Sequence, residues 1–411
     1  MPPKKLSFSQ NALWNTGGCI WYNLCLWGIT MVVVRLSADY ENAGQLQLAL
    51  TITNVFALVA SYNLKTYMVS DMEGVITAGE YFGAQITASL LGTVLCAGYV
   101  LLCGYSPATC GCILAYMLFR VVGTWSEICM GVEQRHERMD YVGISNLLRG
   151  TLLLVFFGVV LRLTDSVTVA SLAMAVSSLG VLLLYDRRMA RQYENVRPVF
   201  RRSVILPLLK KCAPMVISMA AFAAVVTIPR QYLSAHSGTS ALGYYATVAT
   251  PVVVIQVLVT GIFDPVLRSA SESYDARDLS RLKVLALRLL VILSAVSVLA
   301  FAGAHFLGEW ALVLLYGESI RAYSYLLLPV VGCAVLYCLC WIVSTMLVIM
   351  RRLKTQMVLS LLALGAAACL RAFCVKTWAL NGVSFAVMAA YGLYLLLGAV
   401  LILRQLRRDN P

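Results

Sequence analysis

The sequence has 411 residues, of which 60% are hydrophobic and 12% are charged, whereas a soluble domain has about 25% charged residues. Its 32 Lys and Arg exceed its 19 Asp and Glu, giving a net charge of +13. A basic balance can indicate nucleic-acid binding, but here the basic residues lie in short segments between apolar runs of about 20 residues. This pattern argues against nucleic acid as a partner and predicts an all-α polytopic membrane protein.

We predict twelve membrane-spanning helices, six on each side of a long basic segment. This segment, residues 185–212, is expected to be a cytoplasmic linker between an N-terminal lobe (1–184) and a C-terminal lobe (213–404), with a cytoplasmic tail at 405–411. Two six-helix lobes around one connector suggest a pseudo-twofold axis along the membrane normal. The predicted spans are Ala12–Val34, Ala43–Asn63, Gly83–Cys103, Cys110–Met130, Val142–Leu161, Val167–Leu184, Ala213–Leu233, Ala241–Phe263, Val284–Leu307, Tyr325–Met350, Met357–Val375 and Asn381–Leu403.

The distribution of basic residues gives the orientation. An even number of spans places both termini on one side, and most Lys and Arg residues between the spans fall on that same side. The opposite side keeps only four: Arg35, Arg162, Arg321 and Lys376. Because basic loops are retained in the cytoplasm, both termini are predicted to be cytoplasmic.

The fourth predicted span carries a polar stripe in an otherwise apolar helix. Tyr116, Arg120, Thr124 and Glu127 follow one another at helical spacing and share a face. Arg120 would lie about 15 Å into the helix, close to the membrane midplane. A charge at that depth costs about 2.5–3.5 kcal/mol on insertion scales, so it usually faces protein or a watery cavity. We therefore expect Arg120 to face the protein interior or a watery cavity, with Tyr116 and Thr124 beside it.

Two further stripes accompany this one. Asn15 lies on the polar face of the first span and Asn54 on that of the second. These stripes have two open interpretations: a shared hydrophilic cavity, or hydrogen bonds that hold helices together, worth about 0.6–2 kcal/mol per contact. For Arg149, Arg230 and Arg371 the alternative to lining a cavity is that the side chain reaches out to the membrane interface.

Enzyme chemistry has little support in the sequence. The three histidines are predicted in loops or at span ends, and there is no paired-carboxylate or nucleophile motif. The cysteines lack the spacing of a zinc site and are expected to be small apolar residues. We therefore expect no metal and no cofactor, and a transporter rather than a membrane-embedded transferase.

Four segments carry a family resemblance: TYMVSD at 66–71, EQRHERMDYVGISNLLRG at 133–150, IPRQYL at 228–233 and LGYYA at 242–246. They resemble the bacterial oligosaccharide flippases, the polysaccharide branch of the superfamily that also contains multidrug and toxin extruders. The resemblance follows nearly the whole chain in order and spacing. One departure is Lys65, which stands before the VSD motif where the family often has an arginine. A lysine keeps the charge but lacks the two-pronged geometry of a guanidinium.

The resemblance implies a V-shaped alternating-access transporter with a central cationic cavity, in the bacterial cytoplasmic (inner) membrane. The implied substrate is an oligosaccharide repeat unit on polyprenyl pyrophosphate, moved to the outer leaflet for capsule or O-antigen-like polysaccharide. Membrane lipids are expected partners, and contact with polysaccharide polymerase machinery is left open. An antiporter of drugs or small molecules from the same superfamily is the alternative function. The residues expected to contact the substrate are Arg120, Arg149, Lys65, Arg371, Arg230, Asn15, Asn54, Tyr116 and Thr124, with Glu127 compensating charge or carrying a proton.

Overall fold

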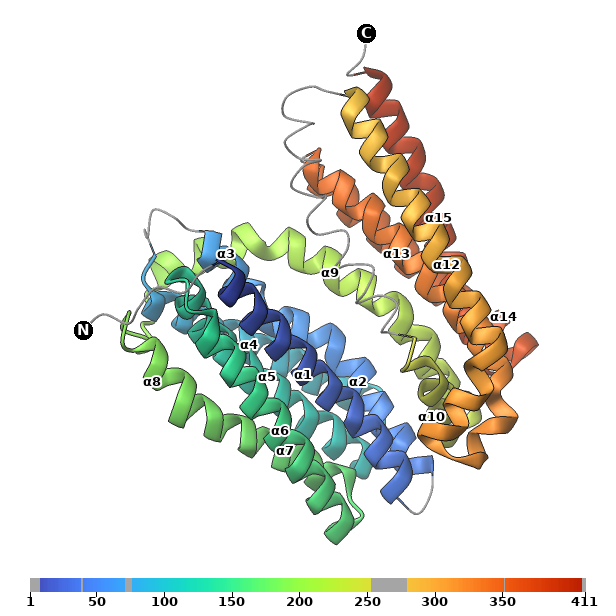
Figure 1. The fold of residues 1–411 in the computed structure, drawn as a ribbon, viewed down its shortest axis with the longest axis horizontal. Coiled ribbons are helices and arrows are strands. Elements are labelled where there is room, and N and C mark those ends of the chain that lie inside the picture. Colours follow the sequence, from blue (N-terminus) through green and yellow to red (C-terminus); the bar gives the residue numbers. More distant parts are fainter. Residues whose placement is uncertain (1–7, 38–39, 71–75, 253–278, 351, 409–411) are drawn as a thin grey trace. The chain divides into compact units, whose positions relative to one another are not determined.

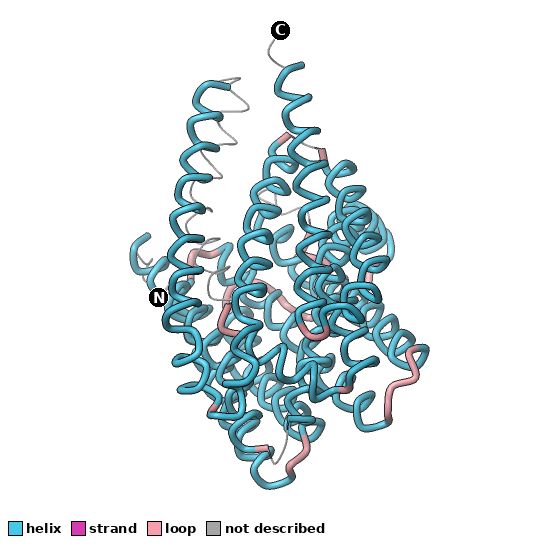
Figure 2. Tube along the Cα trace, turned by 90° about the vertical axis from the view of Figure 1, so that its right-hand side faces the viewer, coloured by secondary structure: helices cyan, strands magenta, loops and turns pink. Residues whose placement is uncertain are grey.

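The computed structural model describes residues 8–37, 40–70, 76–252, 279–350 and 352–408. Every regular element in these ranges is a helix (Figure 2). Eleven helices in the described part are long and apolar enough to cross a membrane, which confirms the all-α polytopic prediction. The predicted span Ala241–Phe263 lies partly outside the described residues, because its helix is described only for Thr239–Ala249. By its internal contacts the chain divides into two compact units, Met1–Ala220 and Ala221–Pro411.

The first unit is built around one long helix, α5, which packs against α2, α4 and α7, while α1 packs along α6 (Figure 1). Ser106 caps the start of α5 and Pro107 occupies its first turn, where a missing N–H costs nothing. The elements of this unit are α1 (Phe8–Leu36), α2 (Tyr40–Ser61), α3 (Leu64–Ser70), α4 (Ala78–Leu102), α5 (Pro107–Arg135), α6 (Met139–Thr164), α7 (Val167–Val181), the π-helical turn η1 (Leu182–Asp186), α8 (Arg187–Ala190) and the first part of α9 (Arg202–Ser237).

Helices α1 and α6 approach at backbone distance. A Cβ atom at Gly18 of α1 would lie 2.7 Å from the backbone of Gly143 of α6, so neither position has room for a side chain. Close approach at small residues is a usual way for membrane helices to associate, since lipid offers no hydrophobic drive between them. This contact sets which face of each helix turns inward.

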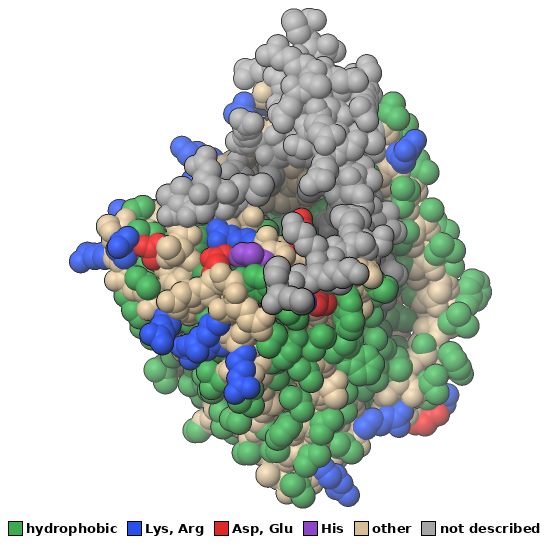
Figure 3. Space-filling view, turned by 60° about the vertical axis from the view of Figure 1, so that its left-hand side comes forward, with side chains coloured by type: hydrophobic (Ala, Val, Ile, Leu, Met, Phe, Trp, Pro, Cys, Tyr) green, Lys and Arg blue, Asp and Glu red, His purple; other side chains and the backbone are tan. Residues whose placement is uncertain are grey.

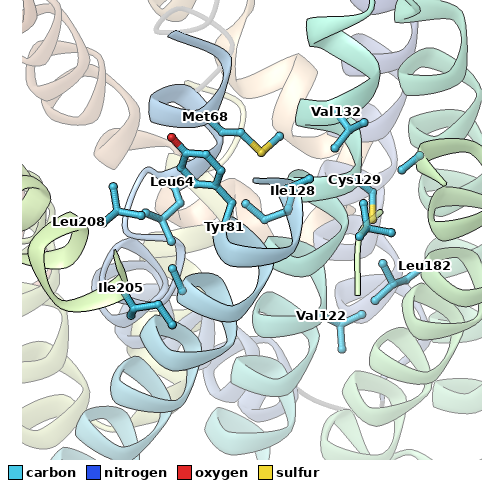
Figure 4. Packing of buried hydrophobic residues seen from close by; sticks show 14 residues of the cluster. Leu64, Met68, Tyr81, Val122, Ile128, Cys129, Val132, Leu182, Ile205 and Leu208 are labelled. Carbon is cyan, nitrogen blue, oxygen red and sulfur yellow. The ribbon is translucent and has the colours of Figure 1, made fainter. Parts of the chain in front are cut away.

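An apolar core holds α3, α4, α5 and η1 together near one end of the unit. Leu64, Tyr81, Ile128 and Leu182 are all buried in this cluster, and Figure 4 shows their side chains converging from these elements. On the outside of the helices, large apolar side chains such as Leu102, Leu163 and Val176 are exposed. Figure 3 shows a broad apolar area beside a region where charged side chains gather, as expected for a membrane protein.

The segment between α8 and α9 packs on the first unit. Val199 donates its N–H to the carbonyl of Gly79 at 2.9 Å, and a Cβ at Gly83 would overlap the Val199 carbonyl. Arg201 forms an ion pair with Glu80 at 3.1 Å, and the same Glu80 completes the capping box at the start of α4 with Thr77. Part of the stretch expected to be a linker is therefore held against α4.

The α5–α6 loop contacts the same segment. Arg138 donates to both carboxylate oxygens of Asp140, at 2.9 and 2.7 Å, and to the Tyr193 hydroxyl at 3.1 Å. These hydrogen bonds to Asp140 raise the pKa of the Arg138 guanidinium, so it is cationic at every physiological pH. Arg135 lies 3.5 Å from Glu194.

The second unit contains the remaining helices. α14 packs along α15, and α15 also packs against α13. Phe222, from the later part of α9, contacts Tyr391 and Tyr394 of α15, with ring centroids 5.3 Å apart in both pairs. Its elements are α10 (Thr239–Ala249), α12 (Leu279–Tyr316), the 3₁₀ helix η2 (Glu318–Leu326), α13 (Leu327–Ile349), α14 (Leu353–Trp378) and α15 (Asn381–Arg408).

Candidate functional site

Arg149 lies inside the first unit, between α1, α5 and α6. Its side chain is buried, with 4% of the residue exposed, so it does not reach out to the membrane interface. The guanidinium lies over the Tyr22 ring of α1, 5.3 Å from the ring centroid. On α5 it lies against Gly123, where a Cβ atom would be 3.2 Å from Arg149 Nη2. The absence of a side chain at Gly123 therefore makes room for the guanidinium.

Arg120 lies one turn along α5 from this contact. It stands 13 residues after Pro107 in a helix of 29 residues, and is half-buried. Tyr116, one turn earlier, is buried and makes an edge contact with Phe119, with 5.3 Å between centroids. The Tyr116 hydroxyl lies within electrostatic reach of both Arg120 and Tyr22.

These contacts bring together residues from three helices. We use the name two-arginine cluster for Arg120 and Tyr116 of α5, Arg149 of α6 and Tyr22 of α1. Gly123 follows Arg120 by three residues, a rise of about 4.5 Å, so the Arg149 guanidinium lies about one turn along α5 from Arg120. Sequence reasoning treated these arginines separately and left Tyr22 out of the site, although Tyr22 shares the polar face of Asn15.

Three further residues of the predicted substrate site, Thr124, Asn15 and Asn54, lie outside the two-arginine cluster. Thr124 is buried toward α4, where its hydroxyl lies 3.2 Å from that of Ser89, and it donates to the Val121 carbonyl at 2.7 Å. Thr124 thus forms a hydrogen bond between α5 and α4. The Asn15 carbonyl oxygen lies 3.8 Å from the Cys19 thiol on its own helix. Asn54 is exposed.

The remaining two candidates of the first unit lie toward the α5–α6 loop. Lys65 of α3 packs its side chain at Gly131, where a Cβ atom would lie 3.5 Å from Lys65 Cγ. Its charge faces Glu133 rather than the two-arginine cluster. Glu127 of α5 is half-buried, and the structure gives it no hydrogen bond or ion pair with another described residue. It follows Gly123 by four residues, so Arg149 contacts α5 between Arg120 and Glu127.

The second unit also pairs arginines with tyrosines. Arg230 of α9 lies over the Tyr245 ring of α10, 5.7 Å from the centroid, and its Nε has no hydrogen-bond partner among the described residues. The Tyr245 hydroxyl lies 2.9 Å from that of Ser384. Arg371 of α14 is exposed and lies 5.8 Å from the Tyr232 ring centroid.

Two acidic residues were misplaced by sequence reasoning. Glu133 was assigned to the charged loop after the fourth span and Asp186 to the basic linker, but both are buried in the structure, with 0% and 1% exposed. α5 continues to Arg135, beyond the predicted end at Met130, and η1 extends the sixth span to Asp186. Charged residues at a span end give no sequence signal for which way they face, and this caused the error.

The arrangement suits recognition of an anion with attached hydroxyl groups. A guanidinium offers planar, paired donors to a phosphate, and tyrosine hydroxyls can donate to or accept from a sugar. Within an apolar bundle, the interaction of the two arginines with an anion is stronger than it would be in water. In the described part of the chain no group of three or more His, Cys, Asp or Glu residues is arranged to hold a metal.

Comparisons with known proteins agree with this description. A family model described as "Polysaccharide biosynthesis protein" matches residues 8–270. The capsular polysaccharide biosynthesis protein CapF of Staphylococcus aureus is 23% identical over 298 residues, which are 72% of this chain and 74% of CapF.

The fold is similar to solved transporter structures. An inward-facing multidrug resistance MATE family transporter of the MOP superfamily matches with a TM-score of 0.73 and 14% identity, over 94% of this chain and 96% of that one. The lipid II flippase MurJ, in an inward closed conformation, matches with a TM-score of 0.72 and 12% identity, over 95% and 87%. The predicted transporter fold is thereby confirmed. With its family match covering more than half of its length, this multi-pass membrane protein belongs to the polysaccharide biosynthesis protein family.

Proposed function

We propose that this protein is a flippase for oligosaccharide repeat units linked to polyprenyl pyrophosphate. It moves them from the cytoplasmic to the outer leaflet of the bacterial cytoplasmic membrane, for assembly of a capsule or similar surface polysaccharide. Both termini lie in the cytoplasm. In this role the protein is a transporter and carries out no bond-making chemistry.

The two-arginine cluster carries this proposal. A pyrophosphate and a hydrated sugar cannot cross hydrocarbon unaided, because each would lose its hydrogen bonds to water. Arg149 and Arg120 supply charge-assisted donors for the pyrophosphate inside the bundle, and Tyr22 and Tyr116 stand beside them. The Arg–Tyr contacts of the second unit, at Arg230 and Arg371, supply donors of the same kind.

Charge also separates this function from the alternative. A cationic drug would be repelled by the positive charges of Arg120 and Arg149, whereas an anionic lipid-linked sugar is attracted to them. The match to a polysaccharide biosynthesis family supports the same choice. The alternative predicts that export of small cationic drugs depends on this protein, which the experiment below also measures.

The test deletes the gene in its native host and identifies the lipid-linked oligosaccharide that accumulates on the cytoplasmic leaflet. Complementation with wild type should clear it, and Arg149→Ala should not, at equal expression. Arg162→Ala is the matched control, because Arg162 is an exposed arginine on the same helix, α6. If no lipid-linked oligosaccharide accumulates and the deletion strain instead becomes sensitive to cationic drugs, the proposed function is wrong.

A further inference from the structure

Two carboxylates, neither of which the proposed function assigns to the substrate, are buried near one another where α5 packs against η1. Glu133 stands in the last turn of α5, and Asp186 is the last residue of the π-helical turn η1. Their exposed fractions are 0% and 1%. They lie close enough to repel one another electrostatically. The pair joins segments 53 residues apart in the chain.

Most oxygens of this pair lack a hydrogen bond. Ser145 of α6 donates to Asp186 Oδ1 at 2.6 Å. Asp186 Oδ2 and both oxygens of Glu133 have no partner among the described residues. The Ser126 hydroxyl of α5 faces Asp186, is buried, and also lacks a hydrogen bond of good geometry there. Three carboxylate oxygens and one hydroxyl are therefore buried in this region without a hydrogen bond to a described residue.

Apolar side chains border these oxygens on one side. Cys129, one turn before Glu133 on α5, lies within electrostatic reach of both carboxylates. Helical side chains lean toward the N-terminus of their helix, so Glu133 leans toward Cys129 and hence toward Asp186. Figure 4 shows Cys129 beside Leu182 at the edge of the apolar core.

Neighbouring cations do not neutralise the pair by direct contact. None of the described basic side chains forms an ion pair within 4.0 Å of Glu133 or Asp186. Asp140 also faces Glu133, but it is engaged by Arg138. Five basic groups face the site at longer range: Lys65 of α3, Arg138 before α6, Arg149 of α6, Arg187 at the start of α8, and Arg191 just after α8.

The backbone at Asp186 departs from a regular α-helix. α7 ends at Val181 and continues as the π-helical turn Leu182–Asp186 before α8 begins. A π-turn widens the helix, rotates the following residues relative to the preceding ones, and often occurs at a functional site. Leu182 and Asp186 both point inward here and are buried. The turn thus helps to bring Asp186 to the interior.

We propose that Glu133 and Asp186 form a binding site for one monovalent cation, either a proton or Na⁺. Two buried anions without an ion-pair partner within 4.0 Å among the described residues are mutually repulsive and costly to desolvate, and one bound positive charge removes most of that cost. The longer-range attraction of Arg149 compensates the charge that remains on Asp186. Ser126 and Ser145 add hydroxyl oxygens, a ligand type suited to a hard cation. A divalent ion fits less well, since Ca²⁺ requires about 6–8 oxygen ligands.

The test uses the purified full-length protein without any glycolipid, so its outcome does not depend on the proposed function. Difference infrared spectroscopy reports whether a buried carboxyl group is protonated, through its carbonyl stretch. Thermal unfolding is measured in parallel while Na⁺ replaces choline at constant ionic strength. If the cation is a proton, the carbonyl band is present and does not respond to Na⁺. If it is Na⁺, the protein is stabilised in a saturable manner and any carbonyl band disappears on addition of Na⁺.

Each signal should be lost in Glu133→Gln and in Asp186→Asn. Glu41→Gln is the matched control, because Glu41 is exposed at the start of α2, and it should retain the wild-type signals. Ser126→Ala keeps both carboxylates and is a second route should a carboxyl variant fail to fold. It should shift the carbonyl band or weaken the Na⁺ response several-fold. Absence of both signals in the wild type, or their persistence unchanged in the Glu133, Asp186 and Ser126 variants, would overturn the proposal.

Discussion

The guanidinium of Arg149 lies over the ring of Tyr22, with 5.3 Å between the guanidinium carbon and the ring centroid. The contact joins α6 to α1, and these helices also meet at Gly18 and Gly143. A cation held over an aromatic face is stabilised by about 2 kcal/mol or more when water is excluded. The contact with Tyr22 thus helps to keep the charged Arg149 side chain inside an apolar bundle. Arg149 Nε has no hydrogen-bond partner among the described residues. Together with the attraction of Asp186, this contact explains how a charged Arg149 side chain can remain buried.

The orientation of the chain can be checked by cysteine labelling in a cysteine-free background. Ser203→Cys, at the start of α9, should react with an impermeant maleimide only from the cytoplasmic side, and Ser319→Cys in η2 only from outside. Both positions are exposed in the structure. The physical reason is that basic segments, such as the one before α9, stay in the cytoplasm. Labelling with the two sides exchanged would contradict the predicted topology.

Arg120→Ala should abolish glycan export while the protein still inserts and folds, because the two-arginine cluster loses one of its two charges. Arg120→Lys should restore export only in part, since an ammonium lacks the paired donors of a guanidinium. Export is measured by the surface polysaccharide of a deletion strain that carries each variant at equal expression. Full export by Arg120→Ala would remove this residue from the site.

Gly123→Ala should reduce export, and displacement of the buried Arg149 guanidinium should offset the stability that a helical glycine-to-alanine change usually adds. Replacing a mid-helix glycine by alanine stabilises a helix by about 0.5–1 kcal/mol. The new Cβ would lie 3.2 Å from Arg149 Nη2, so the guanidinium must shift away from α5. The control is Gly180→Ala in α7, where a Cβ atom meets nothing within 4 Å. That variant should gain stability and keep export, and equal export by the two variants would show that the Arg149 position is not critical.

Glu127→Gln should leave export largely intact. Export by the variant should respond to a pH gradient in the same way as export by wild type. We expect Glu127 to compensate the positive charge around Arg149, which contacts α5 one turn earlier at Gly123. The measurement is translocation of a lipid-linked oligosaccharide in liposomes, with and without a pH gradient, for wild type and variant. A gradient response that is present in wild type and missing in Glu127→Gln would instead assign a coupling proton to Glu127.

Gly83→Ala should destabilise the first unit. Its Cβ would overlap the carbonyl of Val199, and backbone atoms cannot move aside as a side chain can. Overpacking of this kind costs about 1–3 kcal/mol, which should lower the thermal unfolding midpoint. Gly98→Ala on the same helix meets nothing within 4 Å and is the control. A Gly83→Ala protein as stable as Gly98→Ala would show that the segment before α9 is not held against α4.

The sequence by itself determined that the chain is a helical membrane protein and where most of its helices lie. A span must be about 20 apolar residues long, because every backbone polar group must be satisfied within the bilayer. That requirement is local and is legible in the order of residues. It also marked Arg120 and Arg149 as unusual, since charge is rare within such a run.

Only the tertiary structure decided which polar residues meet. Thr124 shares a stripe with Arg120 in sequence, but the packing of α5 against α4 directs its hydroxyl to Ser89. Glu133 and Asp186 looked like loop residues, yet the length of α5 and the π-turn of η1 bury them together. The contact of Arg149 with Gly123 depends on how α6 is rotated about its own axis. Such rotations are set by close packing between helices far apart in the chain, and no local pattern encodes them.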